Sequence, residues 1–483
     1  MSVRVRFAPS PTGKLHIGGL RTALYNWLFA KQHGGTFVLR IEDTDRARYD
    51  AASEDDIIDS LHWAGLAYDE GPRVGGPYGP YYQSERKDLY RSHVDQLVAE
   101  GHAYLAFDPP EALDALRTKN QSYNAVTRGQ MDNALTQSAD EVRRRVEAGE
   151  PFVVRLKVLA GDRVQFTDLI RESVAFDTSE IDDQVLLKSD GMPTYHLANV
   201  VDDHHMRITH VIRGEEWLPS VPKHILLYRA FGWTPPQMAH LPLILAPSGG
   251  KLSKRNAATL GIPVSVEQYR AAGYDSDALV NFLALLGWNP GTEQERFTRD
   301  DLAQAFDFGG VSKSGAKFDL DKLKWFNGQV VREMEVQDLA EAARPALDQA
   351  GHLYDDTTLG AAARLMQERV TFPHEIAEAR YFFEDPTDYD AKGVKKRWKA
   401  DAAELVATFA DQLDELDRFD AETAEHMLRS ITEAREVGAG RLIHPTRLAI
   451  SGVTYGPGLF DLMVAIGREV CVRRMRRAVH ALG

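Results

Sequence analysis

Residues 10–19 combine a histidine with two glycines in a way that suits nucleotide binding. The segment runs from Ser10 to Gly19 and contains His16, Gly18 and Gly19. The glycines remove side chains where a nucleotide would approach the backbone. His16 could donate a hydrogen bond to a phosphate oxygen as negative charge builds in a transition state. Taken alone, the segment is better explained as a turn whose glycines only relieve crowding.

A second segment, Lys251-Leu252-Ser253-Lys254-Arg255, follows the glycine-containing stretch Pro247-Ser248-Gly249-Gly250. A glycine-rich hinge that carries two lysines suits a mobile loop closing over a polyphosphate. Lysine is a compact cation with three donors and could neutralise a leaving pyrophosphate. Taken alone, this segment is better explained as a solvated basic loop.

The elements that would position residues 10–19 form a βαβ unit. Apolar residues alternate with arginines over residues 3–7, which predicts a strand, and apolar residues at helical spacing predict an amphipathic helix from Gly18 to near Gly34. A second strand is predicted at 37–41. Ligands of doubly wound sheets bind at the carboxyl ends of the strands, where the helix N-terminus offers unpaired N–H groups to phosphate.

The rest of the chain divides into a second α/β region and a helical region. Strands are predicted at 184–188 and 208–212, and a helix at 222–231. Residues 271–286 and most of 335–483 show helical periodicity with few strand signals. We therefore expect an α/β core in two halves (1–85 and 201–255), an inserted domain (86–200), a helical domain (256–326) and a helical region (327–483) for which a division near 390 stays open.

Together, the two chemical segments resemble the signature pair of the class I aminoacyl-tRNA synthetases in order, position and separation. Further segments are similar to the glutamyl-/glutaminyl-tRNA synthetase subgroup, namely Phe7–Gly13, Arg40–Asp45, Tyr82–Arg86, Pro193–His204 and Val211–Trp217. The resemblance is ordered from residue 3 to about 330. It is thinner in the helical region and returns around Pro457–Phe460.

The resemblance implies a fold and an activity. The fold is a Rossmann-like, doubly wound α/β catalytic domain with an inserted α/β domain that binds the tRNA acceptor end, followed by all-α C-terminal domains. Of these, residues 256–326 would contact the tRNA stem and residues 327–483 would bind the anticodon. The activity is ATP-dependent formation of an aminoacyl-adenylate and pyrophosphate, then transfer to the terminal adenosine ribose of tRNA. The first step is an in-line displacement by a carboxylate, which needs positioning and charge stabilisation rather than a protein nucleophile.

The resemblance also implies the residues of the site. By position, the glutamate pocket would comprise Arg6, Ala8, Ser10, Glu42, Tyr195, Asn199 and Arg213. The ATP site would comprise His16, Gly18, Gly19, Glu216 and Lys254, and the catalytic residues would be His16, Lys251 and Lys254. Glu42 suits the substrate ammonium group, and a surface pair with Arg40 or Arg46 is the competing interpretation. ATP would enter with Mg²⁺.

Charge favours glutamate over glutamine, because the two amino acids are nearly isosteric. Arg213, together with Arg6, would pair with the side-chain carboxylate, and glutamine would leave buried positive charge uncompensated at a cost of about 2–5 kcal/mol. The resemblance adds that glutaminyl enzymes lack the arginine at position 213 and carry β-barrel anticodon domains, whereas this C-terminal third is helical. The implied enzyme is a bacterial-type glutamyl-tRNA synthetase acting on tRNA(Glu), and acceptance of tRNA(Gln) stays open.

Anticodon recognition would fall to the helical region, where Arg369 is the first candidate and Arg364 and Arg380 are others. Three departures from the family pattern stand out. Gly19 replaces the second histidine of the general motif, and Leu252 replaces the usual methionine. The third departure is Tyr104-Leu105-Ala106-Phe107, which stands where zinc-bearing relatives place cysteines. No structural zinc is therefore expected.

Composition sets further limits. The chain of 483 residues is 43% hydrophobic and 27% charged, and it holds one cysteine, Cys471, so an internal disulfide is excluded. No signal peptide or membrane span is predicted, so a cytoplasmic protein is expected. A monomer is also expected. His204 and His205 with Asp202 and Asp203 could ligate a metal, but polar residues at a strand end are the favoured interpretation, and no metal site is predicted.

The net charge of −14 argues against nucleic acid binding unless basic residues are clustered. Two clusters exist, and for each a tRNA contact and a solvated helix face are equally good interpretations. They comprise Lys392, Lys395, Lys396, Arg397 and Lys399, and Arg473, Arg474, Arg476 and Arg477.

Two other functions compete with a synthetase. A small-molecule adenylyltransferase shares the histidine–glycine helix start but would not need the helical additions or the segment 193–217. An RNA-binding protein with a relic nucleotide fold predicts loss of His16, Arg213 or Lys254, and all three are present.

Overall fold

The computed structural model describes residues 2–45 and 47–483, apart from the side chain of Lys254. The chain forms two compact units, one of residues 1–272 and 276–322 and the other of residues 273–275 and 323–483. Helix α12 (Leu320–Glu333) contains the point at which the chain passes from the first unit to the second.

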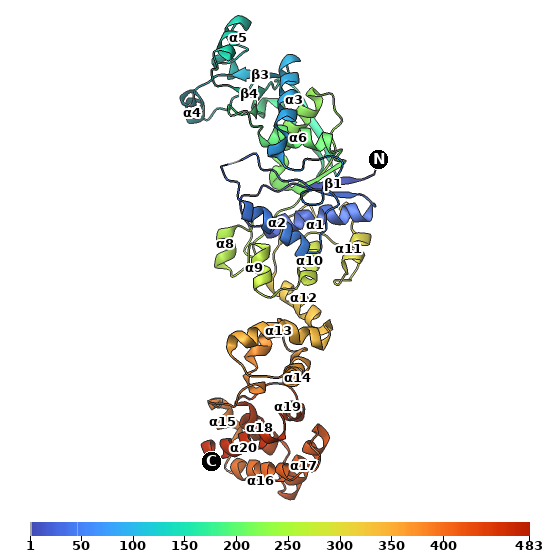
Figure 1. Ribbon diagram of the computed structural model, residues 1–483, viewed down its shortest axis with the longest axis vertical. Coiled ribbons are helices and arrows are strands. Elements are labelled where there is room, and N and C mark those ends of the chain that lie inside the picture. The colour runs from blue at the N-terminus through green and yellow to red at the C-terminus, as the bar shows by residue number, and fades with distance from the viewer. Residues whose placement is uncertain (1, 46) are drawn as a thin grey trace. The chain divides into compact units, whose positions relative to one another are not determined.

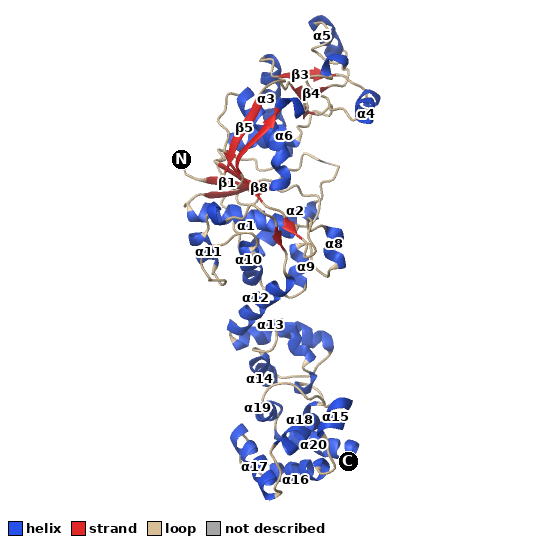
Figure 2. Cartoon of the chain, turned by 180° about the vertical axis from the view of Figure 1, so that it is seen from behind, coloured by secondary structure: helices blue, strands red, loops and turns tan. Residues whose placement is uncertain are grey.

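The first unit holds every strand found in the described chain (Figures 1 and 2). Its strands are β1 (Arg4–Phe7), β2 (Thr36–Leu39), β3 (Ala103–Ala106), β4 (Val153–Leu156), β5 (Arg163–Asp168), β6 (Glu172–Asp177), β7 (Val185–Leu187), β8 (His210–Gly214), β9 (Gln237–Leu241), β10 (Ile244–Leu245) and β11 (Ala316–Lys317). Its complete helices are α1 (Ile17–Gln32), α2 (Ala51–Trp63), α3 (Lys87–Ala99), α4 (Pro110–Thr118), α5 (Ala139–Glu147), α6 (Tyr195–His205), α7 (Val221–Ala230), α8 (Lys254–Thr259), α9 (Val266–Ala271), α10 (Ser276–Leu285) and α11 (Arg299–Ala305).

The βαβ unit predicted at the N-terminus is confirmed. Strand β1 pairs with β2 in parallel, with Arg4 opposite Thr36 and Phe7 opposite Leu39, and α1 forms the connection. The Thr209 amide, just ahead of β8, donates to the Arg4 carbonyl at 2.9 Å. Strand β8 therefore lies beside β1, and the carboxyl ends of both strands face the site.

Three strands of a second sheet matter for the site. Its order is β6-β5-β9-β8, in which β9 runs parallel to both neighbours and β5 pairs with β6 as an antiparallel hairpin. The register places Arg213 of β8 opposite His240 of β9. The strand predicted at 208–212 is present two residues later, and the helix predicted at 222–231 is α7.

Helix α1 is more deeply buried than its sequence suggests. The sequence predicts an amphipathic helix, but buried side chains occur around most of its circumference, including Arg21, Asn26 and Trp27. Helices α10 and α11 pack on α1 from the side opposite β1 and β8 (Figure 2). A helix covered on both sides needs few polar surface positions, so the exposed face predicted for it is largely missing.

Residues 103–187 contain a separate small sheet of order β3-β4-β7, which includes the strand predicted at 184–188. The buried Asp183 carboxylate accepts hydrogen bonds from the Tyr104 hydroxyl at 2.5 Å and from Arg128 at 3.0 Å. Tyr104 begins the stretch where zinc-bearing relatives place cysteines. In this chain, Tyr104 instead donates a hydrogen bond to the buried Asp183 carboxylate.

The second unit is helical, as predicted for residues 335–483. Its remaining helices are α13 (Val336–Ala350), α14 (Asp356–Met366), α15 (Ala391–Arg397), α16 (Ala402–Asp414), α17 (Ala421–Ala434), α18 (Gly440–Ser451), α19 (Leu459–Ile466) and α20 (Arg468–Leu482). A shared apolar core draws residues from α13, α14 and α16 to α20 and includes Cys471.

The C-terminal arginine cluster turns out to be largely structural. Arg474 is buried and donates to Asp385 at 2.8 Å and to three backbone carbonyls. Arg473 pairs with the same carboxylate, and Arg476 pairs with Asp411 and Asp414. These arginines join elements of the helical core, which is a third interpretation beside the two that the sequence suggests.

No helix among the described residues combines the length and apolar character that crossing a bilayer requires.

Candidate active site

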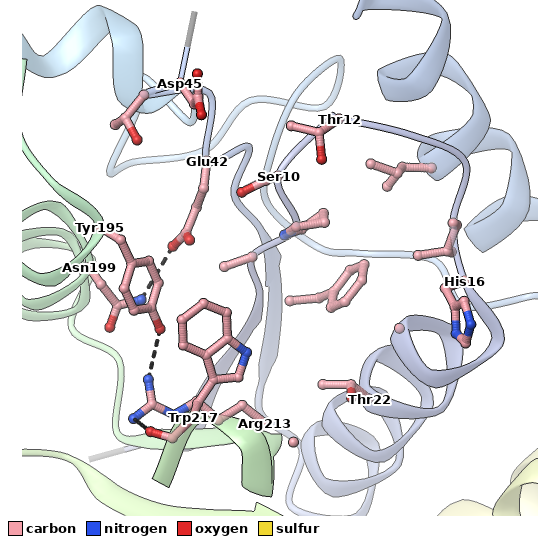
Figure 3. Close-up of a pocket in the computed structure, with 18 of the residues that line it drawn as sticks. Ser10, Thr12, His16, Thr22, Glu42, Asp45, Tyr195, Asn199, Arg213 and Trp217 are labelled. Carbon is pink, nitrogen blue, oxygen red and sulfur yellow. Dashed lines mark hydrogen bonds between the residues drawn. The ribbon is translucent and has the colours of Figure 1, made fainter. Parts of the chain in front are cut away.

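A pocket of about 780 Å³ opens at the carboxyl ends of β1 and β8. Figure 3 shows Glu42, Tyr195, Asn199 and Arg213 at one end and His16, at the start of α1, at the other. Eleven residues predicted for the site line this pocket. They are Arg6, Ala8, Ser10, His16, Gly18, Gly19, Glu42, Tyr195, Asn199, Arg213 and Glu216.

Arg213 is buried at the end of β8, and its guanidinium hydrogen-bonds to neutral groups. Nε donates to Nε2 of His240 at 3.1 Å, and Nη1 donates to the Tyr195 hydroxyl at 2.8 Å. Nη2 lies 3.4 Å from the Trp217 carbonyl. No carboxylate of a described residue forms an ion pair with Arg213. The pocket therefore contains a fixed positive charge that a bound anion could neutralise.

His240 and Asp168 are the polar residues behind Arg213 that the sequence does not predict. Both side chains are fully buried, and Nδ1 of His240 lies 2.6 Å from Oδ2 of Asp168. Burial lowers the pKa of His240, although the hydrogen bond to Asp168 raises it in part. Each is a single polar residue at a strand position, which carries no local signal. Only the pairing of β5, β9 and β8 brings them beside Arg213.

Glu42 is buried, with 6% of its surface exposed, and one carboxylate oxygen accepts from Arg40 at 3.0 Å and from Asn199 at 3.2 Å. Burial raises the pKa of Glu42, and Arg40 and Arg6 partly oppose this. The competing interpretation of Glu42 as part of a surface pair with Arg40 is therefore wrong, since Arg40 is itself fully buried. Arg46, the other partner considered, lies outside the described residues.

A buried network of charges supports this end of the pocket. The Asp203 carboxylate accepts from Arg40 at 2.7 Å and from Arg6 at 3.1 Å, and Asp202 accepts from Arg86 at 2.7 Å. Burial alone would lower the pKa of Arg40, but the carboxylates of Asp203, Asp202 and Glu42 outweigh it and raise that pKa well above its usual value. Arg6 thus lines the pocket while Nε binds Asp203, an arrangement that the sequence does not predict.

The same network shows why residues 202–205 do not converge on a metal. The sequence suggests that these residues lie at a strand end, but they lie at the end of helix α6. Asp202 and Asp203 point inward to arginines, whereas His204 stacks on Trp233 at 3.7 Å between ring centres and His205 lies 3.1 Å from His93. Among the described residues, no group of three or more such side chains could hold a metal ion.

At the other end of the pocket, His16 caps helix α1. Its Nδ1 accepts the Gly18 amide at 3.1 Å, so the neutral ring carries its proton on Nε2, which can act as a donor. The Ile17 amide donates to Val264. Two of the first three amides of α1 are therefore bonded within the protein, which corrects the expectation of a helix start with free N–H groups.

The two glycines at the start of α1 differ in their surroundings. A Cβ at Gly18 would meet only the His16 ring, at an ordinary 3.5 Å. A Cβ at Gly19 would lie 2.9 Å from the buried Leu15 side chain. Packing within the protein therefore accounts for Gly19 but not for Gly18, whose open side faces the pocket.

The Lys251–Arg255 segment follows a tight turn and leads into a short helix. Gly249 and Gly250 have φ of +92° and +74°, a conformation that favours glycine, and Lys251 pairs with Leu245 across the turn. The Ser253 side chain caps α8, which begins at Lys254. The sequence predicts a loop throughout this segment, so helix α8 differs from that prediction. Lys251 is exposed and does not line the pocket, and the Lys254 side chain lies outside the described residues.

The second unit contains its own pocket, of about 540 Å³, between the end of α14 and the turn after α18. Arg369 and Arg380, two of the arginines considered for anticodon recognition, line it together with Tyr381 and Tyr455. Arg364 is exposed on α14 and does not line it.

Comparison with known proteins agrees with this geometry. Residues 2–325 match the catalytic domain model of the class I tRNA synthetases for glutamate and glutamine, and residues 338–479 match an anticodon-binding domain model. The chain is 50% identical to a glutamate–tRNA ligase of Porphyromonas gingivalis, covering 100% of this chain and 99% of that one. It is 48% identical to that of Parabacteroides distasonis, covering 99% of each.

A solved structure is similar over the whole length as well. The crystal structure of a glutamate–tRNA ligase from Elizabethkingia meningosepticum, in complex with its amino acid, has a TM-score of 0.96 and 42% identity and covers 100% of both chains. Matches that extend through the helical region separate this chain from small-molecule adenylyltransferases, which would not need that region. The chain belongs to the class I tRNA synthetases for glutamate and glutamine and, within them, to the glutamate–tRNA ligases.

Proposed function

We propose that this chain activates L-glutamate with ATP and transfers the glutamyl group to the terminal adenosine ribose of tRNA(Glu). The observation that carries the choice of glutamate is Arg213, a buried guanidinium in the pocket whose hydrogen bonds go to neutral acceptors. A substrate carboxylate could pair with it in a bidentate fork. The amide of glutamine would leave that charge uncompensated, at a cost of about 2–5 kcal/mol.

The remaining residues at this end suit the other groups of glutamate. The Glu42 carboxylate, already oriented by Arg40 and Asn199, would bind the substrate ammonium group. Tyr195 contacts Arg213 and would close the side-chain pocket. Arg6, Ala8 and Ser10, from β1 and the loop after it, complete the lining and would contact the bound amino acid.

ATP, entering with Mg²⁺ as a substrate, would occupy the end of the pocket near α1. Since Nδ1 of His16 accepts the Gly18 amide, His16 would donate to a phosphate oxygen through Nε2–H. Gly18 would let the nucleotide approach the backbone, and Gly19 and Glu216 line the same pocket and would lie beside the bound ATP. Lys251 and Lys254 would neutralise the departing pyrophosphate once their segment closes over it.

The other regions would bind tRNA. Residues 86–200, with the sheet β3-β4-β7, would hold the acceptor end, and the matched anticodon-binding domain would read the anticodon. We propose that the chain acts as a monomer, without structural zinc.

The decisive experiment is ATP–pyrophosphate exchange with glutamate or glutamine, each with and without tRNA(Glu). We expect exchange with glutamate only, requiring tRNA as the family resemblance implies. Exchange with glutamine, or no exchange under any of the four conditions, would contradict the proposal.

Arg369 offers a test of anticodon reading. Replacing Arg369 with Ala should raise the KM for tRNA(Glu) about tenfold, because a contact that reads a base is worth about 1–3 kcal/mol. Arg364→Ala is the matched control, since Arg364 is exposed on the same stretch but lies outside the pocket. A KM for tRNA(Glu) in Arg369→Ala equal to that of the wild-type chain would show that Arg369 does not read the anticodon.

A further inference from the structure

Three adjacent strands place a carboxylate, an imidazole and a guanidinium in one continuous hydrogen-bonded row. Asp168 ends β5, His240 lies in β9 and Arg213 lies in β8. Oδ2 of Asp168 lies 2.6 Å from Nδ1 of His240, and Nε2 of His240 lies 3.1 Å from Nε of Arg213. All three residues are buried, so water does not compete for these hydrogen bonds.

The direction of each hydrogen bond follows from the chemistry of arginine. Its Nε can only donate, so Nε2 of His240 must accept, and the neutral imidazole then carries its proton on Nδ1 and donates it to Asp168. The other oxygen of Asp168 accepts the amides of Ile170 at 3.0 Å and Arg171 at 2.9 Å. These backbone contacts fix which oxygen faces His240.

The row also solves a charge problem for the pocket. A carboxylate in direct contact with Arg213 would compensate its buried charge but would occupy the guanidinium that the substrate needs. Asp168 instead lies one imidazole away, does not line the pocket, and is linked to Arg213 through His240. The negative charge can therefore stabilise the buried guanidinium while the pocket stays available to an anion.

We propose that His240 and Asp168 are positioning residues for glutamate recognition, which hold Arg213 by its Nε and orient its terminal nitrogens toward the substrate side-chain carboxylate. This inference rests on the proposed function, in which Arg213 pairs with that carboxylate. It adds two residues that do not touch the substrate and yet determine its affinity.

Asp168→Asn tests the direction of the row. The amide oxygen would keep the backbone N–H contacts, so the amide nitrogen would face His240 and donate to Nδ1. The imidazole proton would then move to Nε2 and oppose the Nε–H of Arg213, a change of tautomer that leaves the shape of the site intact. We expect the KM for glutamate to rise about tenfold to a hundredfold, as for a misplaced binding group, with the KM for ATP unchanged.

Two substitutions of His240 separate positioning from packing. His240→Gln retains an acceptor for Arg213 and a donor for Asp168, so its KM for glutamate should stay near that of the wild-type chain. His240→Leu fills similar space without either group, so its KM for glutamate should rise as in Asp168→Asn. Melting temperatures show whether each variant is folded at the assay temperature. If Asp168→Asn does not fold, the two His240 variants decide between positioning and packing.

The measurements are ATP–pyrophosphate exchange on the full chain with tRNA present and calorimetric titration with L-glutamate alone. A glutamate-specific defect in Asp168→Asn and His240→Leu, with Gln tolerated, supports the proposal. Wild-type glutamate affinity in His240→Leu, an equal rise of both KM values, or a Gln variant as defective as Leu would overturn it. Absence of exchange in the wild-type chain would contradict the proposed function instead, and the titrations would still compare the variants.

Discussion

The two segments of the first unit that would handle substrates differ in how far they are built before any substrate binds. At the glutamate end of the pocket, Arg213, Glu42 and Arg40 are buried, and each is held by two or more hydrogen bonds. In the Lys251–Arg255 segment, Lys251 is exposed and lies away from the pocket lining. The first region is a preformed pocket of fixed side chains, whereas Lys251 would have to move toward the pocket to take part.

Under the proposed function, this difference separates the region that selects glutamate from the segment that assists catalysis. Recognition of an amino acid that is nearly isosteric with glutamine requires charges fixed before binding, because a mobile arginine could adapt to either ligand. Neutralising pyrophosphate requires charge only while the phosphates rearrange, so a segment that closes on ATP is sufficient. The buried region should therefore couple to folding, and the exposed segment should not.

The largest effect should come from breaking the buried network. Replacing Arg40 with Met removes the donor shared by Glu42 and Asp203, and it should lower the free energy of unfolding by about 3–5 kcal/mol because buried carboxylates lose their counter-charge. Urea unfolding monitored by circular dichroism measures this. Lys251→Met, in the exposed segment, should change stability little. Equal losses would remove the distinction between the two regions.

The next effect concerns recognition. Arg213→Gln should lower kcat/KM for glutamate about a hundredfold to a thousandfold, since the loss of a buried charge pair is worth about 2–5 kcal/mol. Because the charge that disfavours glutamine is also removed, the ratio of kcat/KM for glutamate to that for glutamine should fall. Exchange assays with both amino acids measure the ratio. An unchanged ratio would mean that another group selects glutamate.

Lys254→Ala probes the other region. It should slow glutamate-dependent pyrophosphate exchange about a hundredfold, the usual cost of losing a group that stabilises developing charge. Affinity for tRNA, the KM for glutamate and the melting temperature should change little, since α8 is a short helix capped by Ser253 rather than part of the buried network. Equal losses in exchange and in tRNA affinity would argue against a role with pyrophosphate.

The same contrast explains how much of the site could be predicted from the sequence. The residues predicted to line the pocket lie in segments with local signals, where strand alternation gives way to glycine, proline or a helix start, as at 7–19 and 211–217. The βαβ unit places the end of β1 and the start of α1 at one edge of the sheet, so spacing predicts that His16 lies there, whereas Glu42 and Arg213 are assigned to the pocket through the family resemblance. The helical second unit also follows from periodicity.

The buried support of the site could not be predicted in this way. His240 stands between the apolar residues Ala239 and Leu241, and only the register of β8 with β9 places it beside Arg213. Likewise, Asp202 and Asp203 beside two histidines suggest a metal site or a strand end. Local sequence does not reveal which side of α6 faces Arg40, so it does not predict the contact of Asp203 with that arginine. Interactions between residues far apart in sequence carry no periodic signal.

The smallest predicted effect tests whether the end of the pocket near α1 accommodates ATP. Gly18 lies in the first turn of α1 with an ordinary helical conformation, and a Cβ there would meet only the His16 ring at 3.5 Å. Gly18→Ala should therefore fold at least as well as the wild-type chain, because alanine favours a helix over glycine by about 1 kcal/mol. If a nucleotide approaches this backbone, the same methyl group should raise the KM for ATP about tenfold, the usual cost of one unwanted methyl in a fitted site.

Gly19→Ala is the matched control, because its Cβ would lie 2.9 Å from the buried Leu15 side chain whether or not ATP is bound. It should lower the melting temperature, whereas Gly18→Ala should raise the KM for ATP with no loss of stability. Thermal unfolding and ATP-dependent exchange on both variants separate the two effects. A normal KM for ATP in Gly18→Ala would mean that the nucleotide does not approach the backbone at this glycine, and the ATP end would then depend on His16 and the lysine segment instead.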